Sequence, residues 1–262
     1  MAVKNTFKKY DKSGAYHHQL MTSDPFYIAK IHKALSFVTA GGLVCDVGCG
    51  DGVFLKYAKA AGADMVGIDT SEEGIKLAKE FSGCENLHIG FAHELPLEND
   101  STDLIVMIDV INYLEDYSGA IKEAARKLKS GGKLIIMSPI DVDLKEERNS
   151  IDDSWQSHVC NSKELETIIA KDMAVSEVSF IKKPVLKFGL SFAINILIRS
   201  GIINLLRTLL IRPKSETQTN KDTPITTKTD IQQDIYLKHS FAPDCLIKNH
   251  ESIEFVIVGT KE

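Results

Sequence analysis

Three glycines at alternate positions, Gly48, Gly50 and Gly52, follow an apolar segment that ends in Asp46 and Val47. Glycines allow positive φ angles and let a ligand lie against the main chain. The apolar residues after them predict a helix, whose first N–H groups have no partner within the helix and carry the positive end of its dipole. A strand, a glycine turn and a helix in this order form a candidate nucleotide-binding site.

The spacing within this turn distinguishes between ligands. A dinucleotide fingerprint reads G-x-G-x-x-G, but Val53 stands where its third glycine would be, which disfavours a nicotinamide dehydrogenase. Asp46 suits a ligand with a cationic amine better than one that presents a pyrophosphate. The G-x-G-x-G turn preceded by Asp46 resembles motif I of the class I S-adenosylmethionine-dependent methyltransferases, in particular their type 11-like group that acts on small molecules.

Asp69 ends the next predicted strand, over 63–68, one helix after the glycine turn. A carboxylate at that place offers two acceptor oxygens to two ribose hydroxyls; the alternative is an N-cap for the helix that begins near Ser71. The resemblance implies S-adenosylmethionine as the cofactor. The residues expected to contact it are Asp46, Gly48, Cys49, Gly50, Asp69, Thr70, Phe91, Ala92, His93, Asp109 and Val110.

Two of these positions leave alternatives open. Phe91 stands where the family usually has an acid for adenine, so its ring either stacks on the base or faces the core, and the base is then read by the backbone of Ala92 or by His93. Asp109 follows an apolar strand over 104–108, and the resemblance places it at the methionine end of the cofactor. Asp109 could equally be a satisfied carboxylate at the strand end.

The implied reaction is an in-line transfer of the sulfonium methyl group, in which positioning supplies much of the catalysis. A general base is useful if the acceptor is a hydroxyl. We place His17, His158 and Tyr113 first as catalytic candidates, although half-buried packing explains Tyr113 nearly as well. The sequence does not choose among the wider set of His17, His18, His93, Tyr113, His158 and His239. No metal site is expected, since the Asp141-x-Asp143 pair reads as a solvated acidic loop.

Strands and helices alternate with short turns, which predicts an α/β fold: a Rossmann-like doubly wound sheet, mostly parallel, with an antiparallel last strand. We expect one domain over 1–262, with a cofactor-binding core formed by 41–181 and 251–262. An N-terminal helical segment over 1–40 precedes the core, with Asp24 as the N-cap of a helix. This segment is either a lid over the substrate or a packing helix.

The segment 182–250 is predicted to be a helical insertion before the last strand. Its apolar part, 182–212, is interrupted by Asn195 and Arg199, whereas a membrane span needs about 20 nearly uncharged residues. We expect it to pack on the domain and to line the substrate pocket. A peripheral membrane contact through 185–211 is the alternative. The polar stretch 213–230 reads as a flexible linker.

Composition limits the function further. The net charge of −5 over 262 residues argues against a nucleic-acid surface, and five cysteines without zinc-ligand spacing indicate a reducing, cytoplasmic setting. The favoured function is O- or C-methylation of a small, apolar acceptor such as a lipid, a quinone precursor or a polyketide. The alternative is a non-catalytic protein of the same fold that binds a partner or a membrane surface. The sequence does not indicate an oligomeric state.

Overall fold

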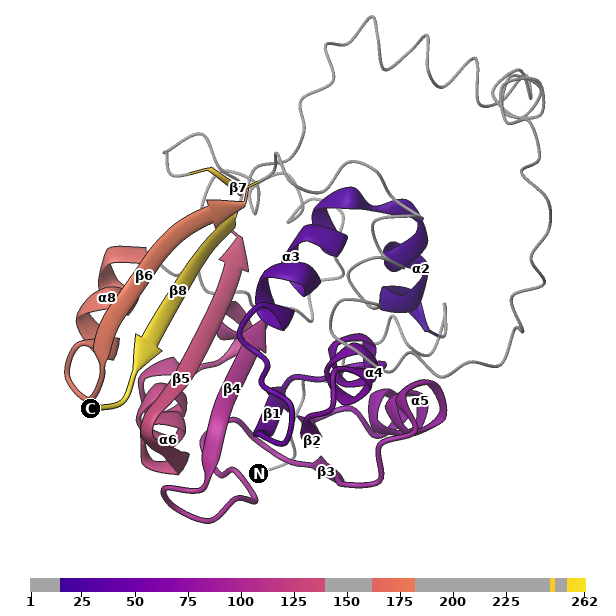
Figure 1. Ribbon diagram of the computed structural model, residues 1–262, viewed down its shortest axis with the longest axis horizontal. Helices are drawn as coiled ribbons and strands as arrows, with labels where there is room; N and C mark the ends of the chain where they lie inside the picture. Colours follow the sequence, from indigo (N-terminus) through magenta and orange to yellow (C-terminus); the bar gives the residue numbers. More distant parts are fainter. Residues whose placement is uncertain (1–14, 140–161, 182–245, 248–253) are drawn as a thin grey trace, which may run out of the picture. The chain divides into compact units, whose positions relative to one another are not determined.

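The computed structural model describes residues 15–139, 162–181, 246–247 and 254–262, all of which belong to one unit (Figure 1). The unit is built on an eight-stranded sheet with the order β3-β2-β1-β4-β5-β8-β6-β7. The strands are β1 Leu43–Val47, β2 Asp64–Asp69, β3 Leu87–Ile89, β4 Thr102–Ile108, β5 Leu128–Pro139, β6 Ala174–Ile181, β7 Leu246–Ile247 and β8 Glu254–Thr260. The expected linker 213–230, the apolar stretch 185–211, His158 and His239 lie outside the described residues.

The directions of the strands confirm the predicted fold class. Strands β3, β2, β1, β4 and β5 run parallel, whereas β8 lies antiparallel between β5 and β6. Within the predicted insertion 182–250, the sequence did not predict a strand. Strand β7 lies there and pairs antiparallel with β6 at the edge of the sheet. The unpaired N–H and C=O groups of an edge strand can form hydrogen bonds with such a short strand.

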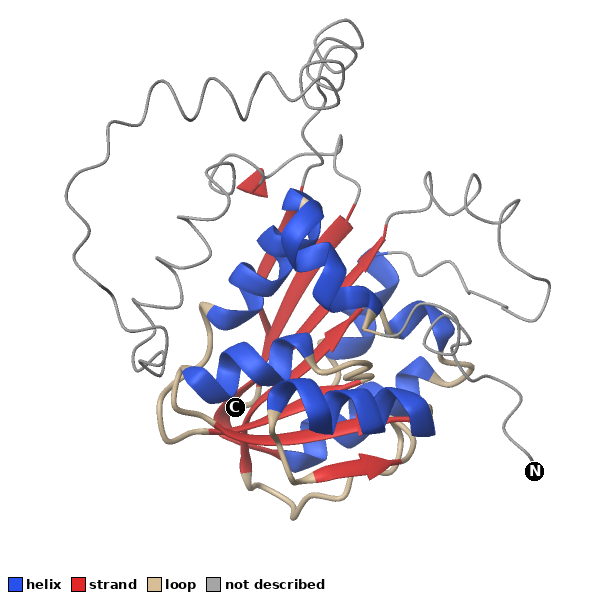
Figure 2. Ribbon diagram, turned by 90° about the vertical axis from the view of Figure 1, so that its right-hand side faces the viewer, coloured by secondary structure: helices blue, strands red, loops and turns tan. Residues whose placement is uncertain are grey.

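Helices cover both faces of the sheet, as Figures 1 and 2 show. One buried cluster joins α2, α3, α4 and α5 to the sheet, and a second joins α6 and α8 to the opposite face. The helices are α2 Tyr16–Ser23, α3 Pro25–Leu35, α4 Val53–Ala60, α5 Glu72–Ser82, α6 Tyr117–Lys127 and α8 Ser162–Ile169, with a 3-10 turn η1 at Ile111–Tyr113. Among the described residues, none of these helices has both the length and the hydropathy to cross a bilayer.

Side-chain caps fix where several helices begin. The carboxylate of Asp24 accepts hydrogen bonds from the N–H groups of Phe26 and Tyr27, which confirms it as the N-cap of α3. The Ser71 hydroxyl oxygen accepts from the Gly74 N–H at 3.0 Å and caps α5. Because α4 and α5 each follow a parallel strand, their N-termini lie at the carboxyl edge of the sheet, where such folds bind ligands.

Candidate functional site

The glycine turn between β1 and α4 has a backbone that only glycine adopts readily. Gly48, Gly50 and Gly52 have φ angles of 72°, 52° and 81°. A Cβ atom at Gly48 would lie 2.2 Å from Cγ2 of Val110, so this turn packs directly against the segment that follows β4. The close approach leaves no room for a side chain at Gly48.

Asp69 at the end of β2 is joined to this turn. Its Oδ2 accepts a hydrogen bond from the Gly50 N–H, and its Oδ1 accepts one from the Ser71 N–H, both at 2.8 Å. The N-cap of α5 is Ser71, so the alternative of Asp69 as N-cap is wrong. Burial raises the pKa of Asp69 and the two N–H donors oppose that rise. Each oxygen keeps a lone pair that can accept from a ligand hydroxyl.

Further carboxylates surround the turn. Asp46 is buried on β1, and burial, followed by the charges of Asp69 and Asp51, raises its pKa to about 8. Asp51, within the turn itself, is fully buried. Burial and mutual repulsion favour the protonated forms of Asp46 and Asp69, and a cationic ligand would favour their ionised forms. A cofactor with a sulfonium and an ammonium group, a ribose diol and no phosphate fits this arrangement.

Helix α2 is held against the turn by Asp51. Its Oδ2 accepts from the His17 N–H at 2.7 Å and the His18 N–H at 3.4 Å, and its Oδ1 lies 3.1 Å from Nδ1 of His17. Ala15, at the N-cap position of α2, provides no side-chain bond, so Asp51 caps this helix from another part of the chain. His17, a predicted catalytic residue, is therefore placed beside the turn, with the ring of Tyr27 stacked on it at 5.6 Å.

Beyond β4, Asp109 has a φ of 57° and lies among charged groups that the sequence did not reveal. Nζ of Lys30, on α3, contacts Oδ2 of Asp109 and lies 3.0 Å from Oε2 of Glu254, the first residue of β8. A signal was available, because Lys30 and Glu254 are charged residues within otherwise apolar runs. Without the fold, nothing indicated that they are partners.

Phe91, which was predicted to lie near the adenine of the cofactor, has its ring on the surface of the protein. Phe91 is 37% exposed and stacks on His93 with a centroid distance of 5.3 Å, while Ala92 between them is buried. Of the two alternatives for Phe91, the core-facing ring is therefore wrong. Thr70 is half-buried next to Asp69, and Tyr113 is half-buried on η1.

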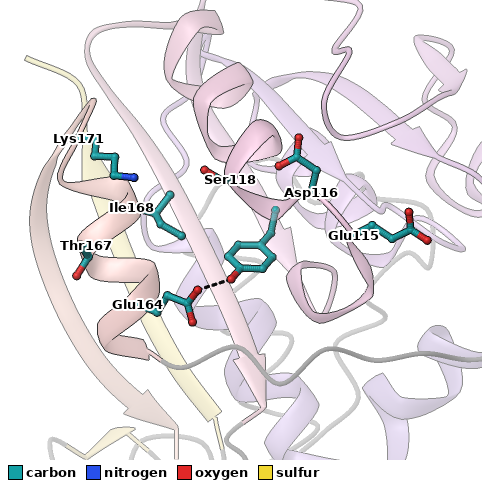
Figure 3. A pocket seen from close by; sticks show the side chains of 8 residues that line it. Glu115, Asp116, Ser118, Glu164, Thr167, Ile168 and Lys171 are labelled. Carbon is teal, nitrogen blue, oxygen red and sulfur yellow. Dashed lines mark hydrogen bonds between the residues drawn. The ribbon is translucent and has the colours of Figure 1, made fainter.

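A separate cavity of about 550 Å³ lies between α6 and α8 (Figure 3). The hydroxyl of Tyr117 donates a hydrogen bond to Glu164 across it. None of the residues predicted for the cofactor or for catalysis lines it; its lining is Glu115, Asp116, Tyr117, Ser118, Glu164, Thr167, Ile168 and Lys171. In the described part of the chain, no three His, Cys, Asp or Glu side chains converge as metal ligands.

Comparisons with known proteins agree with this geometry. Residues 45–136 match the model of a methyltransferase domain. Ajmaline N-methyltransferase of Rauvolfia serpentina is 32% identical over 113 residues, which are 40% of this chain and 39% of that protein. Demethylmenaquinone methyltransferase of Tropheryma whipplei is 33% identical over 101 residues, or 38% of this chain and 42% of the relative. The matches thus span about two fifths of these relatives.

A solved structure extends the likeness to nearly the whole fold. The SAM-dependent methyltransferase from Archaeoglobus fulgidus has a TM-score of 0.58 at 18% identity, over 94% of this chain and 98% of its own. The matched segment 45–136 begins in β1 and ends in β5, so it contains the glycine turn, Asp69 and Asp109. Residues 45–136 are thus similar to a methyltransferase domain, and the fold of the described residues is similar to that of an S-adenosylmethionine-dependent methyltransferase.

Proposed function

We propose that this protein transfers the methyl group of S-adenosylmethionine to a small, apolar acceptor, by O- or C-methylation of a lipid, a quinone precursor or a polyketide-like molecule. The observation that carries the cofactor part is Asp69, whose carboxylate is fixed by the N–H groups of Gly50 and Ser71 beside a main-chain cradle. The apolar composition of 182–212 supports the acceptor class. The similarity to a demethylmenaquinone methyltransferase is in keeping with it.

The chain's own residues have separate tasks in this proposal. Asp69 accepts from the ribose hydroxyls, the glycine turn lies along the nucleoside, and Phe91 with His93 offers a stacking surface for adenine. The bound cofactor supplies an electrophilic methyl group on its sulfonium. The protein orients the acceptor atom in line with it and excludes water. His17, Tyr113 and His158 remain the proposed residues for accepting a proton from a hydroxyl acceptor.

The N-terminal segment is proposed to act as a lid. The N–H groups of His17 and His18, at the start of helix α2, donate to Asp51, which places the helix beside the proposed cofactor site. We propose further that 182–212 lines the acceptor pocket.

Calorimetric titration of the full chain with S-adenosylmethionine tests the cofactor site. Asp69→Ala should weaken binding at least about tenfold, since charge-assisted hydrogen bonds each contribute about 1.5 to 3 kcal/mol. Asp64→Ala is the matched control: Asp64 is an exposed acid at the opposite end of β2, so the dissociation constant should stay within about twofold of wild type. A wild-type protein that binds no S-adenosylmethionine would contradict the proposal.

A screen for production of S-adenosylhomocysteine then identifies the acceptor. Quinols, phenols, polyketides and lipid vesicles should be tested beside hydrophilic amines, and turnover with the apolar set is the expected result. Turnover with the amines alone would show that the acceptor class is wrong. Cofactor binding without turnover on any class, together with vesicle binding that depends on 185–211, would favour the non-catalytic alternative.

A further inference from the structure

A buried ion cluster joins three distant parts of the chain next to the glycine turn. Lys30 is 5% exposed and lies between two carboxylates, Asp109 at the end of β4 and Glu254 at the start of β8. Burial alone would lower the pKa of Lys30, but the two acids outweigh it and raise that pKa. The cluster thus holds one ammonium group against two carboxyl groups.

Each carboxyl group in the cluster has one oxygen left over. Oδ1 of Asp109 and Oε1 of Glu254 are buried, and neither accepts a hydrogen bond from any of the described residues. Glu254 as a whole is only 1% exposed. A buried acceptor without a donor costs roughly 1 to 3 kcal/mol, and more when it is charged. An unpartnered pair of this kind is suited to a ligand that brings N–H donors and positive charge.

The position of the cluster indicates which ligand that is. Asp109 has the left-handed φ of 57°, a strained conformation for a residue other than glycine. The next residue, Val110, is in contact with the turn at Gly48, as the 2.2 Å approach to an added Cβ shows. The strained residue therefore lies at the border of the methyl donor's site and not in a separate part of the molecule.

We propose that Lys30 and Glu254 are positioning residues that hold Asp109 for the α-ammonium group at the amino-acid end of S-adenosylmethionine, an inference that rests on the proposed function. Lys30 occupies one oxygen of each acid, which leaves the other oxygens for the ligand. The ligand class is a cationic amine, because the cluster has more acid than base. An anionic group would be repelled.

A pH dependence distinguishes this role from a purely structural one. Burial, followed by the charge of Asp109, raises the pKa of Glu254 to about 8 against the opposing effect of Lys30. Among the described residues, the charged or titratable groups around it are Lys30 and Tyr27 from α3 and Asp109 from β4. A bound ammonium group favours ionised Glu254, so affinity should rise from pH 6 to 8 and then level off. In Glu254→Gln this rise should become smaller, and the part that remains belongs to Asp46, which ionises over the same pH range.

The experiment compares two ligands by calorimetry, S-adenosylhomocysteine and 5′-methylthioadenosine, which has the same nucleoside but no amino-acid end. Glu254→Gln and Asp109→Asn should each weaken S-adenosylhomocysteine binding about tenfold and leave methylthioadenosine within about twofold. Lys30→Arg, which keeps the charge, should preserve the ratio of the two constants. The matched control is Glu177→Gln, which removes the ion pair of Lys33 on the same helix at 2.6 Å, and neither constant should change.

The outcomes separate this inference from the proposed function. Equal weakening of both ligands, or no change in either, would overturn the positioning role while leaving the cofactor site intact. Wild-type protein that binds neither nucleoside would instead remove the proposed function. Methylthioadenosine binding also shows that the nucleoside site is folded. If Glu254→Gln binds neither ligand because it is unfolded, Asp109→Asn decides whether the positioning role holds, since Asp109 is one-third exposed.

Discussion

At the scale of single residues, Asp46 shows a conflict between stability and binding. Its folded pKa of about 8 lies above the value near 3.9 of an unfolded aspartate. The folded protein therefore holds this proton more tightly than the unfolded chain, and stability from this group is lost as the pH rises from about 4 through 8. A bound cation should compensate for this loss, because it stabilises the ionised form.

The variant Asp46→Asn tests this, because the amide keeps the shape and removes the charge. The gain in the free energy of unfolding over wild type should be roughly 2 to 4 kcal/mol larger at pH 8 than at pH 5. Urea unfolding of both proteins without ligand, at the two pH values, gives the comparison. The same variant should bind S-adenosylmethionine more weakly. An equal effect on stability at both pH values would contradict the raised pKa.

Residue types and spacing predicted the local part of the site but not its partners. The glycines, Asp46 and Asp69 were found because a turn and the end of the next strand have a fixed order along the chain. Lys30, Asp51 and Glu254 were missed as site residues, since their roles depend on contacts between α3, the glycine turn and β8. The orientation of Phe91 was left open for the same reason.

At the scale of elements, the docking of α2 depends on one carboxylate. Asp51 accepts the N–H groups of His17 and His18, and Nε2 of His18 lies 3.0 Å from the Asp51 carbonyl oxygen. An eight-residue helix is marginal without such contacts. If α2 acts as a lid, its position therefore depends on Asp51 in the glycine turn.

Replacing Asp51 by Asn should loosen α2, because a neutral amide oxygen accepts from the N–H groups of His17 and His18 more weakly than a carboxylate oxygen does. Hydrogen exchange of the α2 amides should become at least about tenfold faster, a loss of 1.4 kcal/mol or more of local stability. Exchange in β4 and β5 should not change. Glu72→Gln, an exposed acid in the first turn of α5, is the control and should leave α2 as in wild type. Unchanged exchange in Asp51→Asn would show that other contacts hold the helix.

The start of a helix can be read from the sequence where an N-cap residue marks it. Asp24 and Asp116 both accept from N–H groups two or three residues later, as their positions before apolar stripes indicate. Strand β7 could not be found this way, because a two-residue strand has no periodicity of its own. Its existence depends on the free edge of β6.

At the scale of the whole molecule, acids with raised pKa values gather on one side of the fold. Asp46, Asp69 and Glu254 come from β1, β2 and β8, and burial is the first cause in each case. For all three the folded pKa exceeds the unfolded one. The unliganded protein should therefore lose stability as the pH rises from about 4 towards 8.

A saturating cationic ligand should reverse part of this loss. The rise in Tm caused by S-adenosylmethionine should be larger at pH 8 than at pH 5.5, by several degrees, because the ionised acids bind it better. Scanning calorimetry of the full chain at both pH values measures this difference. A ligand-induced rise that is the same at both values would show that the acids do not contact the charge of the ligand.

The position of β8 has a consequence for how the protein is made. This strand is synthesised after β6 but lies between β5 and β6, with six of its seven residues buried. During translation, both neighbouring strands therefore have an unpaired edge until the ribosome has released residues 254–260. Until then, Lys30 and Asp109 also lack Glu254 as a partner. We expect a nascent chain that lacks β8 to need protection from aggregation, although it already contains the whole segment that matches the methyltransferase domain.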